Sequence, residues 1–418
     1  MADFNGAHVD RSRRTFIASA SAFAGLSMLA ACSKDMPVGN NEAPANQPAG
    51  NDAPSPTPEK VTYEPSSRPG VLIGPGVREK DGQREHWLSM VDLRHVDKFV
   101  SKEAKAVLIP MSFFGHGVIP HPVERTRVAV FSKWGPGACE IDLAAKQVTR
   151  EIEPTAGREF YGHGAWSKDG KTLYGVEAEP RKQGDYDGYI VIRDADNMQV
   201  LGEFPTFGKA PHDCHILDDG KTLAITNGGA QESGDLGCVT FVDIASQTLL
   251  ERVEVPEMMA GHLAITERSS KGDLAIGCTP HSPPGTGPDG FKTIPGGLML
   301  RPSGGKAAMM SDPSEVISKM LGETLSLAIH HELNIVGATN PAGNSITFWD
   351  IKQGSFLKHF EFEEACGIAL TLDKRYFICT ARSKTAVQIV RASDLALVED
   401  ASFTLSGVSG SHCIVYDV

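Results

Sequence analysis

A short sequence element recurs seven times in this chain of 418 residues, and its spacing limits the folds that the chain can adopt. Each copy has a histidine or a small residue, then two to four apolar positions, and in most copies a turn such as Asp-Gly-Lys. Successive copies lie 47, 49, 50, 64, 40 and 46 residues apart. A period of this length predicts a repeated supersecondary unit that packs against its neighbours. The key positions are His116, His163, His212, His262, Ser326, Cys366 and His412.

Each repeat carries signals for four short β-strands. A strand-like run such as Thr172–Val176 follows the turn, and a later apolar strand ends in an aspartate, as at Asp194 and Asp243. Four strands in 40 to 50 residues are typical of a propeller blade. We therefore predict an all-β, seven-bladed β-propeller over residues 70–418, and the regular period argues against two β-sandwiches.

The last copy of the element lies too close to the end of the chain to build a blade. Only six residues follow His412, whereas residues 70–110 contain strand-like runs with no key element before them. We expect the C-terminal strand to complete this N-terminal blade, because such closure removes an open sheet edge.

The first 31 residues resemble an export signal and are excluded from the fold. The pair Arg13 and Arg14 precedes a Ser/Ala-rich apolar run that is short for a transmembrane helix, as in twin-arginine signals. The segment Leu29–Cys32 resembles a bacterial lipobox, in which Cys32 would carry the lipid. A general secretory signal or an ordinary N-terminal helix is the alternative.

Residues 32–69 predict a lipidated cysteine followed by a flexible tether. Eight prolines with no apolar period exclude a folded domain there. We expect a protein anchored by lipid to the periplasmic face of a bacterial membrane. The outer membrane is favoured because Ser33, not an aspartate, follows Cys32.

Composition and missing motifs exclude several function classes. With 52 acidic and 40 basic residues the net charge is −12, which argues against nucleic acid as a partner. Eight cysteines are too few for a disulfide scaffold. The chain has no P-loop, GxSxG, HExxH or CxxCH motif, so the sequence favours a binding protein over an enzyme.

Several motifs together resemble one bacterial family. These are Tyr161–Ser167, Gly202–Pro205, Pro211–Asp213 and Thr226–Gly229, read with the export signal. They resemble the twin-arginine-exported propellers of domain-of-unknown-function family 1513, within the YVTN and quinoprotein-type propellers. That family is often associated with imelysin-type, iron-linked periplasmic proteins. The resemblance implies metal or iron handling and periplasmic metal-uptake proteins as partners.

The key positions form the first candidate site. Each one begins the innermost strand of a blade, so we expect a ring at one mouth of the central channel. Imidazoles and a thiol there suit a transition metal, iron or copper, or another small ligand. The alternative is structural, with each histidine bonded to the backbone of the next blade. We also expect opposite histidines to be too far apart to share an ion, so that about three adjacent ones would bind it. The candidate ligands are His116, His163, His212, His262, His412 and Cys366.

Two other regions predict alternative functions. Glu177 and Asn227 fall near the end of a second strand, and on loops of one face they would suit a lactonase-like hydrolase. Residues 280–323 predict a loop insertion that could serve as a protein-interaction platform. In it, Asp312–Glu315 indicates a helix start with a capping box, and the local methionines suit either core packing or Cu(I).

Overall fold

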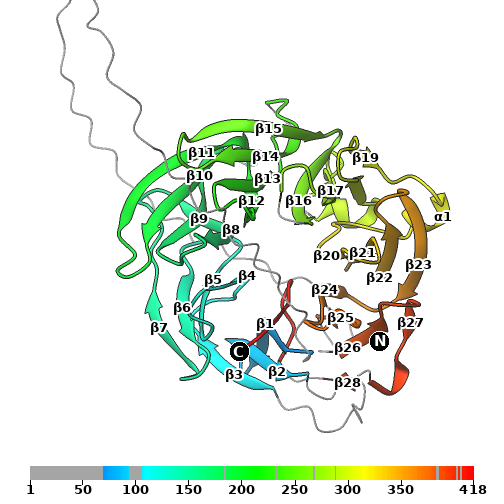
Figure 1. Cartoon of the computed structure of the whole chain (residues 1–418), viewed down its shortest axis with the longest axis horizontal. Coiled ribbons are helices and arrows are strands. Elements are labelled where there is room, and N and C mark those ends of the chain that lie inside the picture. Colours follow the sequence, from blue (N-terminus) through cyan, green and yellow to red (C-terminus); the bar gives the residue numbers. More distant parts are fainter. Residues whose placement is uncertain are drawn as a thin grey trace, which may run out of the picture. The chain divides into compact units, whose positions relative to one another are not determined.

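The computed structural model describes residues 69–93, 106–182, 185–230, 233–266, 269–287, 289–382, 386–401, 403–404 and 407–418. They form seven antiparallel sheets arranged in a ring, so the predicted seven-bladed β-propeller is confirmed (Figure 1). The expected twin-arginine pair, Arg13 and Arg14, and the expected lipid-bearing Cys32 lie outside the described residues. Within the described residues no helix is long and apolar enough to cross a membrane.

The blades follow one another in chain order. Blade 1 contains β1 (Val71–Lys80), β2 (Gln83–Asp92), β3 (Val107–Met111) and β29 (Ile414–Tyr416). Blade 2 contains β4 (Gly117–Pro120), β5 (Arg127–Phe131), β6 (Ala138–Asp142) and β7 (Gln147–Glu151). Blade 3 contains β8 (Glu159–Trp166), β9 (Thr172–Lys182), β10 (Asp185–Asp194) and β11 (Val200–Lys209). Blade 4 contains β12 (Pro211–Ile216), β13 (Thr222–Asn227), β14 (Gly237–Asp243) and β15 (Thr248–Val255).

The remaining blades complete the ring. Blade 5 contains β16 (Met258–Ile265), β17 (Leu274–Pro280), β18 (Gly297–Arg301) and β19 (Ala308–Met309). Blade 6 contains β20 (Leu327–His330), β21 (Ile335–Asn340), β22 (Ser345–Asp350) and β23 (Ser355–Glu361). Blade 7 contains β24 (Ala365–Leu370), β25 (Tyr376–Ala381), β26 (Ala386–Arg391), β27 (Ala396–Leu397) and β28 (Phe403–Thr404). The short helices are η1 (Gly290–Thr293), α1 (Ser314–Ile317) and η2 (Glu399–Ala401).

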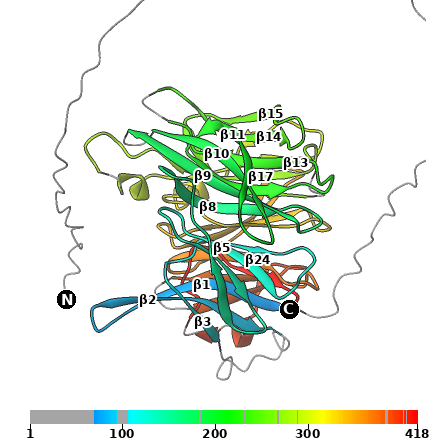
Figure 2. The same cartoon turned by 90° about the vertical axis from the view of Figure 1, so that its left-hand side faces the viewer.

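The C-terminal strand closes the ring as predicted. Strand β29 pairs antiparallel with β1, with Tyr416 opposite Val71 and Ile414 opposite Ile73. Because β29 is the innermost strand of blade 1, both ends of the propeller domain share one sheet. In Figure 2 the hairpin of β1 and β2 extends beyond the rest of this blade.

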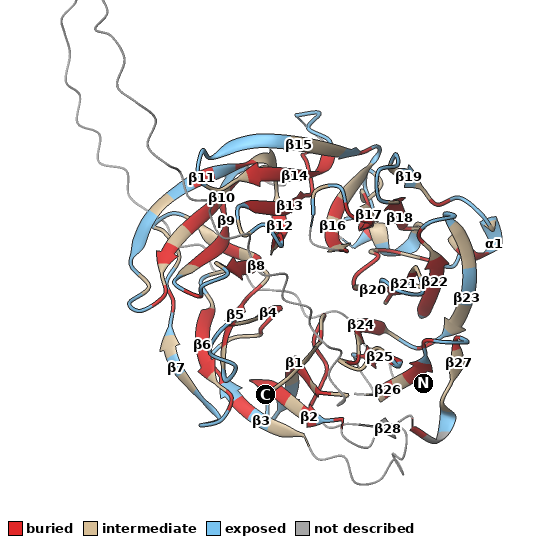
Figure 3. Ribbon diagram, in the orientation of Figure 1, coloured by how far each residue is buried: buried red, intermediate tan, exposed pale blue. Residues whose placement is uncertain are grey.

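The hydrophobic core lies between neighbouring blades. Strands β13 and β14 are almost wholly buried, whereas the outermost strands β7 and β15 are largely exposed (Figure 3). Aromatic rings join adjacent sheets: Phe131 of blade 2 lies 5.4 Å from Phe160 of blade 3, ring centroid to ring centroid. Such edge-to-face pairs between stacked sheets fix the spacing of the blades.

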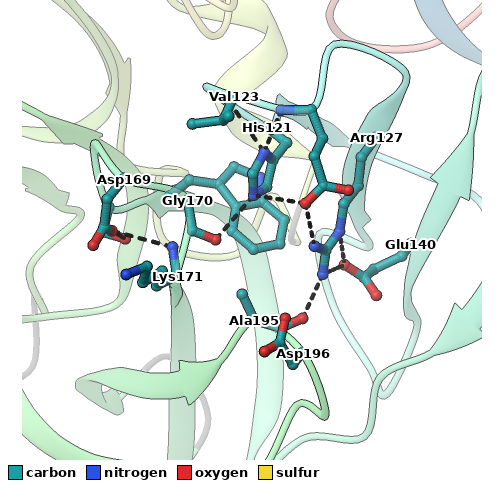
Figure 4. A network of polar contacts seen from close by, with 12 residues as sticks. His121, Val123, Arg127, Glu140, Asp169, Gly170, Lys171, Ala195 and Asp196 are labelled. Atoms are coloured by element: carbon teal, nitrogen blue, oxygen red, sulfur yellow. Dashed lines mark hydrogen bonds and ion pairs between the residues drawn. The ribbon is translucent and has the colours of Figure 1, made fainter.

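Polar contacts also join neighbouring blades, as the network in Figure 4 shows. The Nε2 atom of His121, in blade 2, is 2.9 Å from the carbonyl oxygen of Gly170 in blade 3. Its Nδ1 accepts the backbone N–H of Glu124 at 2.8 Å. Arg127 donates to Glu140 at 2.6 Å and also to the carbonyl of Ala195. Both ring nitrogens of His121 are therefore used within the fold.

The predicted loop insertion over residues 280–323 is wrong in part. It contains β18 and β19, which are the two outer strands of blade 5. Helix α1 begins at Ser314 as expected, but no side chain caps it, so the predicted capping box is absent. The buried Met310 and Met320 pack between blades 5 and 6, and Met299 packs between blades 4 and 5. The 64-residue step therefore reflects two long connections, one between β17 and β18 within blade 5 and one between β19 and β20, which joins blade 5 to blade 6.

Candidate metal centre

Five histidines from the key positions gather inside the channel. Four of them are buried and His412 is half-buried, and nine pairs of their rings have centroids 4.2 to 5.6 Å apart. We call this group the histidine cluster. Its members are His116, His163, His212, His262 and His412.

Irregular strand pairing directs three of these side chains into the channel. In β12, Pro211 lies opposite Asn227 and Cys214 opposite Ile225, which leaves one extra residue at His212 and Asp213. Similar register shifts occur in β8 before Gly164 and in β16 at His262. Because a bulge bends its strand and re-aims a side chain, it moves the imidazole out of the sheet and toward the axis.

The Nε2 atoms of the cluster crowd together without satisfactory hydrogen bonds. The Nε2 of His116 lies 3.1 Å from the Nε2 of His212 and 3.1 Å from that of His412. One nitrogen of a neutral imidazole either donates or accepts, so it cannot serve both contacts. The Nε2 atoms of His163 and His262 are buried and have no partner among the described residues.

The Nδ1 atoms, in contrast, are held by oxygen atoms. Nδ1 of His212 is 2.8 Å from the carbonyl of Tyr161, and Nδ1 of His412 is 2.6 Å from the Ser326 hydroxyl. A carbonyl can only accept, so His212 carries its proton on Nδ1 and presents a lone pair on Nε2. Anchoring of the outer nitrogen in this way is typical of metal-binding histidines.

Asp213 holds the third anchored imidazole. Its Oδ1 lies 3.4 Å from Nδ1 of His163, and its Oδ2 lies 3.2 Å from Nε2 of His215. Burial raises the pKa of Asp213, but His215, His163 and the N–H of Leu263 outweigh burial and hold the pKa below its ordinary value. The negative charge of the ionised carboxylate stabilises a proton on Nδ1 of His163, which leaves Nε2 free to bind.

Electrostatics favours the neutral imidazoles that a metal needs. Burial lowers the pKa of every histidine in the cluster, and neighbouring histidines or Lys133 lower it further. One potential ligand atom from each of His116, His163, His212 and His262 lies within 4.8 Å of all the others. Nitrogens bound tetrahedrally at about 2.1 Å lie roughly 3.4 Å apart, so a modest contraction would enclose an ion.

The histidine cluster separates two cavities. The wide cavity, of about 1660 Å³, is lined by His116 together with Lys133, Trp134 and Arg382. The narrow cavity, of about 370 Å³, is lined by the other face of the cluster and by Asp213, His215 and Lys168. The cluster thus occupies the interior of the channel, rather than one mouth as the sequence predicted.

Two expectations about the ring were wrong. Two of the six candidate ligands, His412 and Cys366, are not in the group of four whose ligand atoms gather. Nε2 of His412 still lies 3.1 Å from Nε2 of His116, whereas the Cys366 thiol lies beside Arg382 and burial raises its pKa to about 11. Opposite histidines were expected to be too far apart, yet the rings of His116 and His262 are 5.6 Å apart. Bulges carry three of the five imidazoles, those of His163, His212 and His262, toward the axis, a displacement that a simple blade radius does not include.

The two weak catalytic candidates do not lie on loops. Glu177 is fully buried in β9, where it pairs with Arg193 and accepts the N–H of Thr155 at 3.0 Å. Asn227 is the last residue of β13, fully buried, and donates to Thr240 at 3.1 Å. Their loop placement was wrong, because the second strands are longer than the sequence suggested, and both side chains serve the fold.

Sequence reasoning missed the residues that hold the cluster in place. Asp213 follows a key position directly, so the Pro-His-Asp motif itself was the available signal. A second repeated contact joins a backbone N–H to the hydroxyl of a threonine 13 residues later in the chain. The N–H groups of Asp213, Ser326 and Gly367 donate in this way to Thr226, Thr339 and Thr380. Thr226 and Thr339 then donate to a carbonyl of the next blade.

Comparisons with known proteins agree with this fold. A family profile described as "Protein of unknown function (DUF1513)" matches residues 109–404. No curated protein matches the chain. Among solved structures, the Kuenenia stuttgartiensis hydrazine synthase is similar, with a TM-score of 0.56 and 15% sequence identity over 80% of this chain and 99% of that chain. At this identity the similarity concerns the fold alone.

Proposed function

The chain belongs to the DUF1513 family, whose function is unknown, and we propose that it binds one transition metal ion in the histidine cluster. The observation that carries this proposal is the orientation of the imidazoles. The Nε2 atoms of His116, His212 and His412 converge. The Nδ1 atoms of His163, His212 and His412 are held by oxygens.

The alternative is that the cluster histidines only bond the backbone of the next blade, and two histidines outside the cluster show what that arrangement looks like. His121 and His330 each join one blade to the next, and both of their ring nitrogens have hydrogen-bond partners. The Nε2 atoms of His163 and His262 have none among the described residues. Burying two such atoms costs about 1–3 kcal/mol each, a cost that a bound cation would remove.

The donor set restricts the metal. Imidazole suits iron, copper, zinc and nickel, whereas thiolate or thioether ligands would select Cu(I). Because Cys366 lies outside the cluster, the set is all nitrogen and borderline in softness. We propose iron or copper, and a role in periplasmic metal handling. The twin-arginine pattern at Arg13 and Arg14 supports this location, since that route exports folded, cofactor-loaded proteins.

We also propose that the mature protein is held at the membrane by lipid on Cys32. The support is the sequence Leu29–Cys32 followed by the proline-rich tether. In a host with this pathway, Cys32→Ala would release the protein from the membrane fraction. Replacing Arg13 and Arg14 with lysine would retain it in the cytoplasm. Unchanged fractionation of both variants contradicts the proposal.

Elemental analysis of the natively exported protein tests the metal proposal. We expect one ion per chain, and loss of that ion in the His163→Ala/His212→Ala double variant. The matched control is His330→Gln, which removes a buried histidine that has partners for both nitrogens. Circular dichroism establishes that each variant is folded. Substoichiometric metal in the parent, or full occupancy in the folded double variant, rejects the proposal.

A further inference from the structure

The two cavities beside the histidine cluster differ in the charge that they bring to it. On the narrow side, Asp213 is buried against His163 and supplies a negative charge. The lining of the wide cavity is mixed, with the basic Arg78, Arg84, Lys133, Lys292 and Arg382 and the acidic Glu79, Glu151, Glu153, Asp289 and Glu323. The side chains of this lining that act most on the cluster are positive: Lys133 lowers the pKa of all five histidines, and Arg382 lowers that of His412. Beside the cluster itself, an anion is therefore favoured on the wide side, next to Lys133.

The positive charge on the wide side is only partly balanced. Lys133 pairs with Glu323 at 3.7 Å, a contact that joins blade 2 to the segment before blade 6. Arg382 has no ion pair among the described residues, and it lies beside the Cys366 thiol, where it opposes the rise in pKa that burial causes. A divalent ion held by neutral imidazoles would add two positive charges next to that of Lys133, and an anion bound beside the cluster would offset them.

The wide cavity has room and walls for an organic molecule. Its volume of about 1660 Å³ exceeds what water or a simple inorganic anion needs. Phe113, Phe114 and Trp134 line it, and Trp134 is 60% exposed with its ring 5.1 Å from Nζ of Lys133. An aromatic wall beside a cation is suited to a ligand that has both an apolar body and an anionic group.

We propose that the wide cavity binds a small organic carboxylate that completes the coordination of the metal on the side of His116. This inference rests on the proposed metal site and names the class of ligand that the site takes. The carboxylate would contact Lys133 and Arg382, while its apolar part lies against Phe114 and Trp134. His116 is the one imidazole of the cluster that lines this cavity, so it marks the face where the ligand meets the ion.

Binding of benzoate to metal-loaded and metal-free full-length protein tests the inference. Calorimetry should give at least about tenfold tighter binding to the metal-loaded form, and the metal's absorption spectrum should change on binding. Lys133→Met and Arg382→Gln should each weaken binding about tenfold, because each removes one charge-assisted hydrogen bond. Metal content is measured on every sample. A parent protein that does not hold metal contradicts the proposed function, whereas a metal-loaded parent that does not bind the carboxylate more tightly contradicts this inference.

The matched control is Lys168→Met, which removes a lysine that lines the narrow cavity and pairs with Asp218. We expect it to leave carboxylate affinity unchanged. Equal binding with and without metal overturns the inference, as does an unchanged spectrum in the fully metallated protein. A larger effect of Lys168→Met than of Lys133→Met would place the ligand on the wrong side and also overturn it.

Discussion

The carboxylate of Asp213 lies 3.4 Å from Nδ1 of His163, and both side chains are buried. This contact fixes the imidazole with its Nε2 directed into the histidine cluster. Asp213 contacts no proposed metal position itself, so it acts by positioning His163. The negative charge of Asp213 stabilises a proton on Nδ1 of His163, and this decides which nitrogen of His163 is free to bind.

Asp213→Asn should weaken metal affinity by about 10- to 100-fold, the range usual for the outer partners of metal ligands. The amide is neutral and no longer stabilises the proton on His163. Competition against a chromophoric chelator measures the affinity. The control is Asp169→Asn, because Asp169 lies in an exposed turn between β8 and β9 of blade 3. This variant should bind the metal as tightly as the parent does. Equal affinities of the two variants would contradict the positioning role.

Gly162→Ala should disrupt the cluster because the added methyl group meets an imidazole. The φ angle of Gly162 is +117°, and a Cβ there would lie 2.7 Å from Cε1 of His212. Gly157→Ala is a matched control, since its φ of +83° carries similar strain while its Cβ would meet nothing within 4 Å. Both variants should lose about 1 kcal/mol of unfolding free energy from the strained backbone.

Only Gly162→Ala should also lose bound metal, measured by elemental analysis of the folded protein. If both glycine variants kept full metal occupancy, His212 would not need its present position, and the assignment of its ligand role would fail.

Thr226→Val should destabilise the propeller by about 1–3 kcal/mol, because two buried backbone groups lose their partner. Its hydroxyl accepts the N–H of Asp213 at 2.8 Å and donates to the carbonyl of Gly261 in the next blade at 2.6 Å. Thr347→Val is the control. Thr347 is equally buried, but its hydroxyl has no partner among the described residues, so its removal should be neutral or stabilising. Chemical denaturation compares the two, and a reversed order of stability would contradict this account.

Removal of residues 414–418 should open the ring, because it deletes β29 and exposes the edge of β1. The truncated protein is expected to melt at a lower temperature and to form oligomers, since an unpaired edge strand recruits other strands. Differential scanning calorimetry and size-exclusion chromatography measure both effects. Removing Val418 alone, an exposed residue beyond β29, should change neither. A monomeric truncated chain with parental stability would show that closure is not needed.

His330 should make stability depend on pH through its neutral form. Its Nε2 is 3.0 Å from the carbonyl of Lys374 and its Nδ1 accepts the N–H of Leu333, so a second proton would displace one partner. Burial lowers the pKa of His330 below its ordinary value of 6.5. Its contribution is therefore complete above pH 6.5 and is lost as the pH falls through the lowered pKa.

His330→Gln should accordingly lose less melting temperature between pH 7.5 and pH 5 than the parent protein does. Both proteins are compared in metal-free form, so that release of metal at low pH does not enter the comparison. A parallel decrease in the two proteins would contradict a role for this histidine.

The periodicity of the chain determined the architecture. A key element at regular steps, each followed by turns and strand-like runs, predicted seven blades and closure by the C-terminal strand, and both are confirmed. This succeeded because each blade depends mainly on local strand pairing and apolar alternation, which a sequence records directly. The same periodicity selected the five histidines, since residues at equivalent positions of a closed repeat face one axis.

The tertiary structure alone decided how these histidines meet. Bulges in β8, β12 and β16 turn the imidazoles inward, and this brings rings together that the sequence analysis expected to lie too far apart. It also excluded Cys366, buried Glu177 against Arg193, and assigned Asp213 to His163 across neighbouring blades. Such contacts depend on register shifts of one or two residues and on which side chain reaches the next sheet, and neither is determined by local sequence pattern.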